Sequence, residues 1–237
     1  MLVLLVLSVC AIPFRAHLRR PVVAVIQVMK GKKTISDRVS QYGEAARKRL
    51  APQFANAKVA YPPCGVTLVG LKAERTLQVW VSGNDGKWTH LHDYPILGIS
   101  GVLGPKLKEG DMQVPEGLYR VESLNPNSLY HLALRVNYPN SQDRLWGKQD
   151  GRSKLGSDIM IHGNTGSVGC LAMGDEASED LFVLIAETGI DHVSIILAPV
   201  DFRTRQLPSQ MPSLPPWAGQ LYETIKKELQ KLGVSST

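Results

Sequence analysis

The spacing of apolar residues changes along the chain, and each change marks a different expected element. From Val39 through Ala46 to Leu50 these residues recur with helical spacing, which predicts a helix capped by Ser36 or Asp37. Charged residues fill most of the other positions, so the helix is expected to pack on one side only.

From residue 64 onward the pattern is that of short strands. Strands are expected at residues 66–69, 77–81, 117–124, 129–137, 158–162 and 192–198. The turn signal Asn84-Asp85-Gly86 has strand-like segments on both sides and predicts a hairpin. Glycine, proline and asparagine cluster between the other strands. The pattern therefore predicts a mainly β fold, an antiparallel sandwich or barrel with flanking α-helices.

Two more helices are expected nearer the C-terminus. One begins at Asp175, which could cap it, and stops at Gly189. The other covers residues 217–232 and carries a stripe at helical spacing, made of Leu221, Ile225, Leu229 and Leu232. The stripe predicts packing on the same domain, with attachment to a membrane surface as the alternative.

The first 30 residues are rich in apolar side chains and are expected to be a signal or membrane-anchor segment. The run from Leu2 to Phe14 is shorter than the about 20 residues of a membrane span but suits a signal-peptide core. Its positive charges begin at Arg15, after the run instead of before it. This predicts a protein of the periplasm or cell envelope, exported or anchored through this segment.

The expected organisation follows these elements. It comprises a signal or anchor segment (1–30), a helical segment (31–63), a strand-rich domain (64–203), a Pro-rich linker (204–216) and a C-terminal helix (217–237).

Composition narrows the choice of partners. The chain has 237 residues, 43% hydrophobic and 20% charged, which is ordinary for a globular protein. Its net charge of +6 comes from Lys and Arg spread over the whole chain, so no nucleic-acid partner is expected. A basic surface suits anionic lipid or a cell-wall polyanion, although an ordinary solvated surface explains it equally well. Three cysteines leave at least one thiol unpaired, which raises the question of its role.

One segment combines residue types that carry chemistry. A predicted strand ends at His162, a loop with three glycines follows, and Cys170 comes eight positions after the histidine. Such a loop can fold back and bring the two side chains together. An imidazole beside a thiol can take its proton and make the sulfur a nucleophile. The carbonyl of Gly163 is expected to hold the imidazole in one tautomer.

The same loop offers groups that could support a reaction. The backbone N–H groups of Gly169 and Cys170 are expected to face a developing oxyanion, and the Ser167 hydroxyl to support the turn. The alternative is that Cys170 is a small buried residue and His162 a polar residue satisfied within the fold. Two ligands do not make a zinc site, so no metal is expected, and no cofactor either.

At these residues the chain resembles the L,D-transpeptidase family with the YkuD-type catalytic domain. The family motif runs His-Gly, a variable loop, then Ser-x-Gly-Cys, and here it is His162-Gly163 followed by Ser167-Val168-Gly169-Cys170. The resemblance covers about residues 64 to 200. It implies that Cys170 attacks the carbonyl at the L-centre of diaminopimelate in a peptidoglycan stem peptide. His162 would act as base and then as acid, and an amine or water would resolve the acyl-enzyme.

The resemblance also implies partners and substrate contacts. The expected partners are peptidoglycan stem peptides and an envelope lipoprotein. Stem peptides carry free carboxylates, which suit arginine. The residues expected to contact them are Arg144, Arg152, Tyr138, Asn140, His131 and Asn164. For His131 the alternative is a histidine satisfied within the fold.

Two departures from the family pattern leave the reaction type open. The loop is about half the common length, and Val168 and Ala172 stand where most members have His and Arg. The short loop resembles a branch of Gram-negative envelope proteins that includes hydrolases releasing a lipoprotein from peptidoglycan. The alternatives to a transpeptidase are such a hydrolase, a non-catalytic wall-binding module and a structural envelope protein. A sortase-like thiol enzyme is a further alternative, which the short spacing disfavours.

Overall fold

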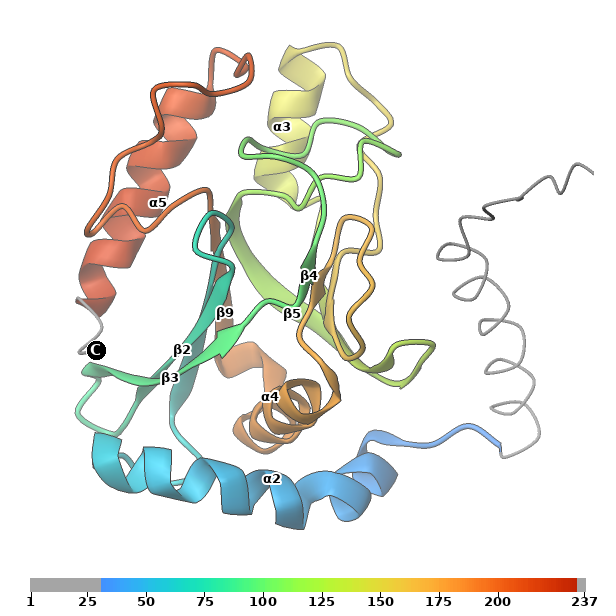
Figure 1. Cartoon of the computed structure of the whole chain (residues 1–237), viewed down its shortest axis with the longest axis vertical. Coiled ribbons are helices and arrows are strands. Elements are labelled where there is room, and N and C mark those ends of the chain that lie inside the picture. Colours follow the sequence, from blue (N-terminus) through green and yellow to red (C-terminus); the bar gives the residue numbers. More distant parts are fainter. Residues whose placement is uncertain (1–30, 234–237) are drawn as a thin grey trace, which may run out of the picture. The chain divides into compact units, whose positions relative to one another are not determined.

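One mixed β-sheet of nine strands organises the part of the chain that the computed structural model describes, residues 31–233 (Figure 1). Residues from Thr34 onward belong to one compact unit. The expected signal or anchor segment, residues 1–30, lies outside the described residues. Within residues 31–233, no helix is both long and apolar enough to cross a membrane.

The strand order in the sheet is β3-β2-β1-β9-β5-β6-β7-β8-β4. The strands are β1 (Gly65–Leu71), β2 (Thr76–Ser82), β3 (Trp88–Pro95), β4 (Gly98–Ile99), β5 (Gly117–Ser128), β6 (His131–Val136), β7 (Met160–His162), β8 (Leu171–Ala172) and β9 (Val193–Ala198). Only the pairs β1–β9 and β7–β8 are parallel among these strands. The predicted mainly β fold and the β2–β3 hairpin are confirmed. The two-residue strands β4 and β8 were not predicted, because two residues show no period.

Four α-helices and one short 3₁₀ helix flank the described sheet. They are α2 (Ile35–Ala57), α3 (Ser141–Gln149), α4 (Asp175–Thr188), η1 (Ile190–His192) and α5 (Ala218–Leu232). Three of them, α2, α4 and α5, were predicted, and α3 was not. The segment before α3, Tyr138-Pro139-Asn140, has residues typical of a loop, yet Asn140 is the N-cap of that helix.

Two cap assignments made from the sequence were wrong. Thr34 caps α2, since its hydroxyl accepts from the Asp37 N–H while the Asp37 carboxylate accepts from the Thr34 N–H. Gly174 precedes α4, so Asp175 is the first helical residue and not the cap.

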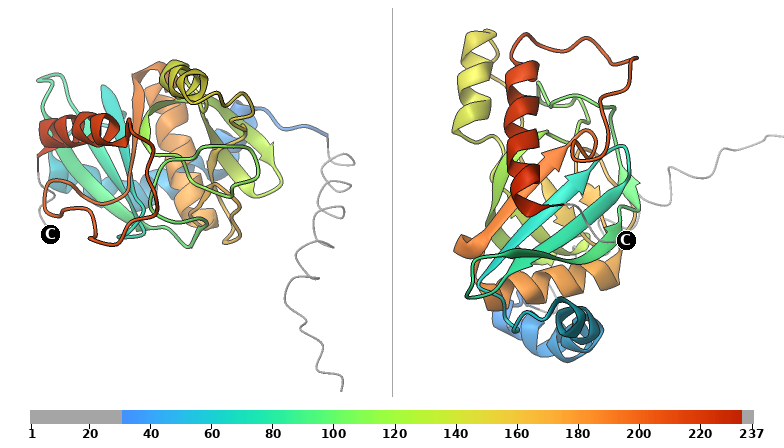
Figure 2. Two further views of the ribbon diagram at one scale, coloured as in Figure 1. Left: turned by 90° about the horizontal axis from the view of Figure 1, so that it is seen from above. Right: turned by 90° about the vertical axis from the view of Figure 1, so that its left-hand side faces the viewer.

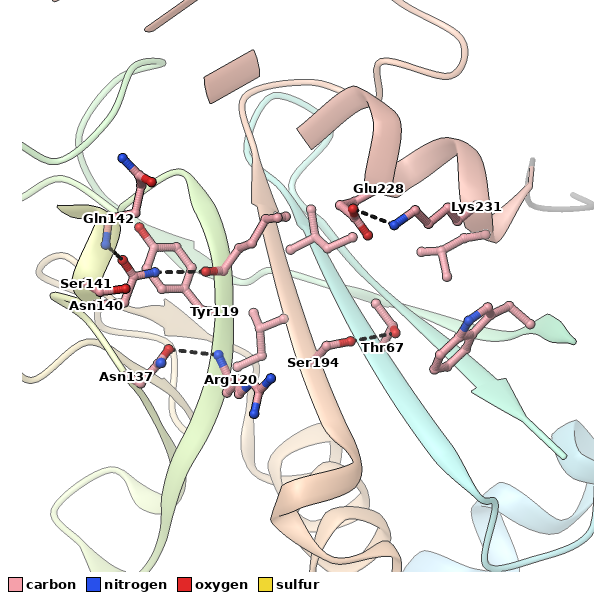
Figure 3. A pocket seen from close by; sticks show the side chains of 15 residues that line it. Thr67, Tyr119, Arg120, Asn137, Asn140, Ser141, Gln142, Ser194, Glu228 and Lys231 are labelled. Carbon is pink, nitrogen blue, oxygen red and sulfur yellow. Dashed lines mark hydrogen bonds and ion pairs between the residues drawn. The ribbon is translucent and has the colours of Figure 1, made fainter. Parts of the chain in front are cut away.

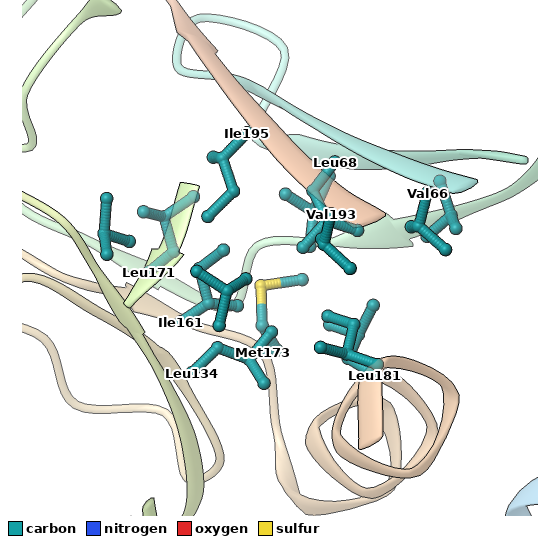
Figure 4. Close-up of a cluster of buried hydrophobic side chains, with 14 of the residues drawn as sticks. Val66, Leu68, Leu134, Ile161, Leu171, Met173, Leu181, Val193 and Ile195 are labelled. Atoms are coloured by element: carbon teal, nitrogen blue, oxygen red, sulfur yellow. The ribbon is translucent and has the colours of Figure 1, made fainter. Parts of the chain in front are cut away.

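Apolar side chains gather on both faces of the sheet. Successive residues of a strand point to opposite faces, so Val66 and Leu68 join the larger cluster while Val69 faces the other way. Figure 4 shows part of the larger cluster, where side chains of β1, β7, β8 and β9 meet Leu181 of α4. Helix α2 covers the same cluster, and Figure 2 shows α2 and α4 side by side.

The second cluster lies under α5. The predicted stripe of this helix is buried against Val69, Ile196 and neighbouring side chains. Packing of the stripe on the same domain is therefore confirmed. Leu207 and Leu214, which lie in the Pro-rich stretch of the chain between β9 and α5, also pack on this cluster.

Candidate active site

The pairing of β7 with β8 places the two motif residues on one face of the sheet. Ile161 lies opposite Leu171, and His162 lies opposite Ala172. The side chains of Ile161 and Leu171 point into the larger cluster. Because side chains alternate, His162 and Ala172 point to the other face. Cys170, two residues before Ala172, lies on that same face one step before β8 begins. The loop thus returns the thiol to the strand next to that of the imidazole.

His162 is held in one orientation. Its ring is almost fully buried, at 1% exposure, and lies 4.6 Å from the Tyr130 ring, centroid to centroid. Its Nδ1–H donates to the Gly163 carbonyl oxygen at 2.6 Å, the contact that we expected from the sequence. This bond leaves the Nε2 lone pair to accept a proton. Burial lowers the pKa of His162, against the opposing effect of the Gly163 carbonyl, so the neutral base is favoured.

Cys170 is half-buried and its thiol is protonated at rest. Its Sγ–H donates to the Asp158 carbonyl oxygen at 3.5 Å. Burial raises the pKa of the Cys170 thiol and the Asp158 carboxylate adds to this, while a backbone contact with Met160 and the charge of Lys106 oppose it. The thiol and the imidazole are therefore each neutral at rest. Such a pair suits a base that takes the proton as the sulfur attacks.

Two serine hydroxyls fix the loop before the thiol. Ser167 Oγ accepts from the Cys170 N–H at 3.1 Å and donates to the Cys170 carbonyl oxygen, so it supports the turn. Ser100 Oγ accepts from the Gly169 N–H at 2.7 Å and donates to the Met112 carbonyl oxygen at 2.7 Å. The two N–H groups that we expected at an oxyanion are thus both bonded to hydroxyls here.

The two arginines expected at the substrate lie in different settings. Arg144 is exposed on helix α3. Arg152 donates to the Asp150 carboxylate and, at 2.6 Å, to the Leu107 carbonyl oxygen. Its guanidinium also lies over the Trp217 ring. These contacts hold Arg152 to the α3 and α5 region.

Tyr138 and Asn140 serve the fold around α3. The buried Tyr138 hydroxyl donates to the Leu155 carbonyl oxygen at 3.0 Å. Asn140 accepts from two N–H groups of α3 and donates to the Leu118 carbonyl oxygen at 2.9 Å. Neither contact involves the loop between His162 and Cys170.

His131 and Asn164 lie beside Gly163. His131 Nε2 is 2.9 Å from Glu179 Oε1. A Cβ built on Gly163 would stand 2.9 Å from the His131 Cβ, so only glycine fits there. Asn164 is exposed, and its backbone N–H donates to Asp175 Oδ1 at 2.7 Å, which ties the loop to the start of α4. Of the six expected contacts, these two lie next to the motif.

Sequence reasoning missed three residues of the site: Ser100, Tyr130 and Asp158. Ser100 and Tyr130 reach the motif from distant segments through a hydroxyl and a ring, and Asp158, just before β7, reaches it through its backbone carbonyl. A carbonyl contact such as that of Asp158 carries no side-chain signal. Ser100 stands between Gly98 and Gly101, a setting that reads as an ordinary turn.

A separate pocket lies over β1, β9 and β5, between α3 and α5 (Figure 3). It has a volume of about 410 Å³, and its lining includes Asn140, Arg120 and Ser194 but neither His162 nor Cys170. No group of three or more His, Cys, Asp or Glu residues within 31–233 is arranged to hold a metal ion.

The chain is similar to known proteins across this site. Residues 66–195 match the model of the YkuD family, described as the L,D-transpeptidase catalytic domain. The chain is 37% identical over 116 residues to "Putative L,D-transpeptidase YafK" of Escherichia coli (strain K12). That match covers 48% of this chain and 44% of YafK, so the chain matches less than half the length of this relative.

Two solved structures are similar at lower identity. The helical cell shape determining protein Pgp2 from Campylobacter jejuni has a TM-score of 0.48 and 23% identity, covering 62% of this chain and 50% of Pgp2. L,D-transpeptidase 1 of Mycobacterium tuberculosis has a TM-score of 0.33 and 15% identity, covering 56% of this chain and 62% of that one.

Proposed function

We propose a reaction for this chain on the premise that it belongs to the YkuD L,D-transpeptidase family, whose model matches more than half of its residues. The reaction is acyl transfer through Cys170 on diaminopimelate-containing stem peptides of peptidoglycan. It would serve wall cross-linking or the attachment of an envelope lipoprotein.

One observation carries the proposal. His162 of β7 and Cys170, one residue before β8, lie on the same face of the sheet, and the Nδ1 bond to Gly163 leaves Nε2 as the base. A family domain with this neutral pair has the nucleophile and the proton acceptor that acyl transfer needs.

The proton and bond changes balance in two steps. In the first, Sγ attacks the carbonyl at the L-centre while Nε2 of His162 takes the thiol proton. The imidazolium then protonates the leaving amine, the C–N bond breaks, and a thioester remains on Cys170. In the second, an acceptor amine attacks the thioester, gives its proton to Nε2, and the proton returns to Sγ. Water in place of the amine gives hydrolysis.

From the proposed substrate we also infer a location. The protein would act in the periplasm or cell envelope, which it would reach through residues 1–30. A reporter fused after residue 30 and assayed in cell fractions tests this. Release of the reporter into the cytoplasmic fraction alone would contradict it.

The test of the reaction uses the purified protein and defined muropeptides with diaminopimelate. New cross-linked dimers in the presence of an amine acceptor support transfer, and shortened stems or freed lipoprotein peptide show the hydrolase instead. The Cys170→Ala variant is expected to lose all turnover. A carbapenem is expected to add its mass to Cys170 in the wild type and not in the variant. A folded wild type without turnover or adduct would favour a wall-binding module.

A further inference from the structure

A small charged cluster lies next to Cys170 that the reaction above does not use. Arg135 Nη1 is 2.5 Å from Asp158 Oδ1, and Arg135 Nε is 2.5 Å from Glu122 Oε2. The side chains keep 36%, 62% and 52% of their surface exposed, in the order Arg135, Asp158, Glu122. One cation and two carboxylates are thus open to a ligand.

Strand register places this cluster beside the nucleophile. Arg135 of β6 lies opposite Met160 of β7, and the β7–β8 register places Cys170 next to Met160. Leu134 points into the larger cluster, so Arg135 points to the same face as His162 and Cys170. Two inter-strand spacings, about 10 Å, separate the backbones of Arg135 and Cys170. The long guanidinium arm can cross much of that distance.

Asp158 connects the cluster to the thiol itself. Its carbonyl accepts from the Cys170 thiol while its carboxylate pairs with Arg135. Its backbone has φ of 60°, a left-handed conformation that few residues other than glycine adopt. Strained residues of this kind gather at functional sites, where surrounding contacts hold them.

The mixed charge of the cluster specifies its ligand. A guanidinium recognises a carboxylate, and the N–H groups of Nη2 are not used by the two ion pairs. The carboxylates of Asp158 and Glu122 suit an ammonium. A ligand with both groups on one carbon, a free α-amino acid zwitterion, satisfies the whole cluster. A ligand that carried only a carboxylate would be repelled, because the cluster has two carboxylates and one guanidinium.

We propose that Arg135, Asp158 and Glu122 form the subsite that binds the free zwitterionic end of the substrate. The inference rests on the proposed function, because diaminopimelate in a stem peptide carries such an end at its D-centre. Three methylenes join that centre to the L-centre, so the zwitterion lies a few bonds from the carbonyl that Cys170 attacks.

The test measures binding and not turnover, in the Cys170→Ala protein by calorimetry. Three stem tetrapeptides are compared, which differ only at the third residue: diaminopimelate, diaminopimelate acetylated on the D-centre amine, and lysine, which lacks the second carboxylate. The diaminopimelate peptide is expected to bind about 10- to 100-fold more tightly than either of the others.

Two variants assign the preference to its residues. Arg135→Gln is expected to remove the preference over the lysine peptide. Asp158→Asn is expected to reduce the preference over the acetylated peptide, and asparagine also tolerates the left-handed backbone. Arg47→Gln is the matched control, since Arg47 is another half-exposed arginine paired with a glutamate, on α2. It is expected to change neither preference.

The outcomes separate this inference from the proposed function. Equal binding of the three peptides, or a preference that survives Arg135→Gln with the fold intact by thermal melting, overturns the zwitterion subsite alone. Selective binding together with a wild type that turns over no stem peptide supports the subsite and overturns the proposed reaction. If the ion pairs of Arg135 only stabilise the fold, Arg135→Gln lowers the melting temperature and leaves the ratios of the three dissociation constants unchanged. That result also overturns the subsite.

Discussion

The sheet face under α5 and the region formed by β7 and β8 are held together in different ways. Helix α5 has 15 residues, and its whole apolar stripe is buried on long strands. Strands β7 and β8 have three and two residues, and hydroxyls of Ser100 and Ser167 fix the loop between them. Apolar area stabilises the first region, whereas a few directed bonds set the geometry of the second. Substitutions in the two regions should therefore separate stability from catalysis.

The largest effect is expected for Leu229→Ala in α5. Leu229 is fully buried, and truncating such a leucine costs about 2–5 kcal/mol of unfolding free energy. Urea denaturation measures this loss, and turnover per folded molecule should stay unchanged. The control is the exposed neighbour Lys227→Ala, expected to be near neutral. A lower kcat in the fully folded Leu229→Ala variant would show that α5 also affects the active site. The two regions would then not separate stability from catalysis.

A smaller effect on stability and a larger one on catalysis are expected for Gly169→Ala. Gly169 has φ of 83°, where a side chain costs about 1–2 kcal/mol. The new Cβ would also approach the Gln113 carbonyl oxygen at 3.4 Å. The shifted thiol should lower kcat about tenfold or more, measured on muropeptides.

Gly166→Ala in the same loop is the matched control, since no positive φ is recorded there and no atom lies within 4 Å of the new Cβ. Equal losses in the two variants would mean that the loop does not position the thiol.

The same contrast explains what the sequence could predict. In α5, burial follows the helical period, and in β1 all seven residues are buried, so a helical stripe identified the first and a short apolar run the second. The motif loop was found by residue type, because His162 and Cys170 combine a base and a nucleophile at the two ends of a glycine-rich loop. Ser100 and Asp158 could not be found this way. The contact of Ser100 depends on the pairing of β4 with β8, two segments far apart in the chain, and that of Asp158 is made by a backbone carbonyl, which every residue has.

Ser100→Ala is expected to have a modest effect. The variant removes one hydroxyl that bridges Gly169 and the Met112 carbonyl, worth about 0.5–1.5 kcal/mol. If the bond positions the nucleophile, kcat should fall several-fold with KM unchanged, and Ser100→Thr should restore most of it. A changed KM with normal kcat would instead assign Ser100 to substrate binding.

The smallest effect concerns pH and follows from the neutral pair. The pKa of His162 is lowered by burial, so below pH 6.5 the unfolded chain binds a proton that the folded chain does not. Stability should therefore fall as the pH drops below 6.5 and level off under the folded pKa. The pKa of the Cys170 thiol is raised by burial, so alkylation by iodoacetamide should accelerate only above the ordinary value of 9.0.

Urea denaturation of the wild type and of His162→Gln from pH 8 to pH 5 gives the difference in their unfolding free energies at each pH. This difference isolates the contribution of His162 to the pH dependence of stability. Wild-type stability should fall faster on acidification than that of the variant. The acid limb of kcat/KM should lie below pH 6.5, because the neutral imidazole is the base. If alkylation were already fast at pH 7 and slowed on acidification with an apparent pKa below 7, Cys170 would rest as a thiolate. The region of β7 and β8 would then owe its reactivity to a resting thiolate and not to the placement of two neutral groups.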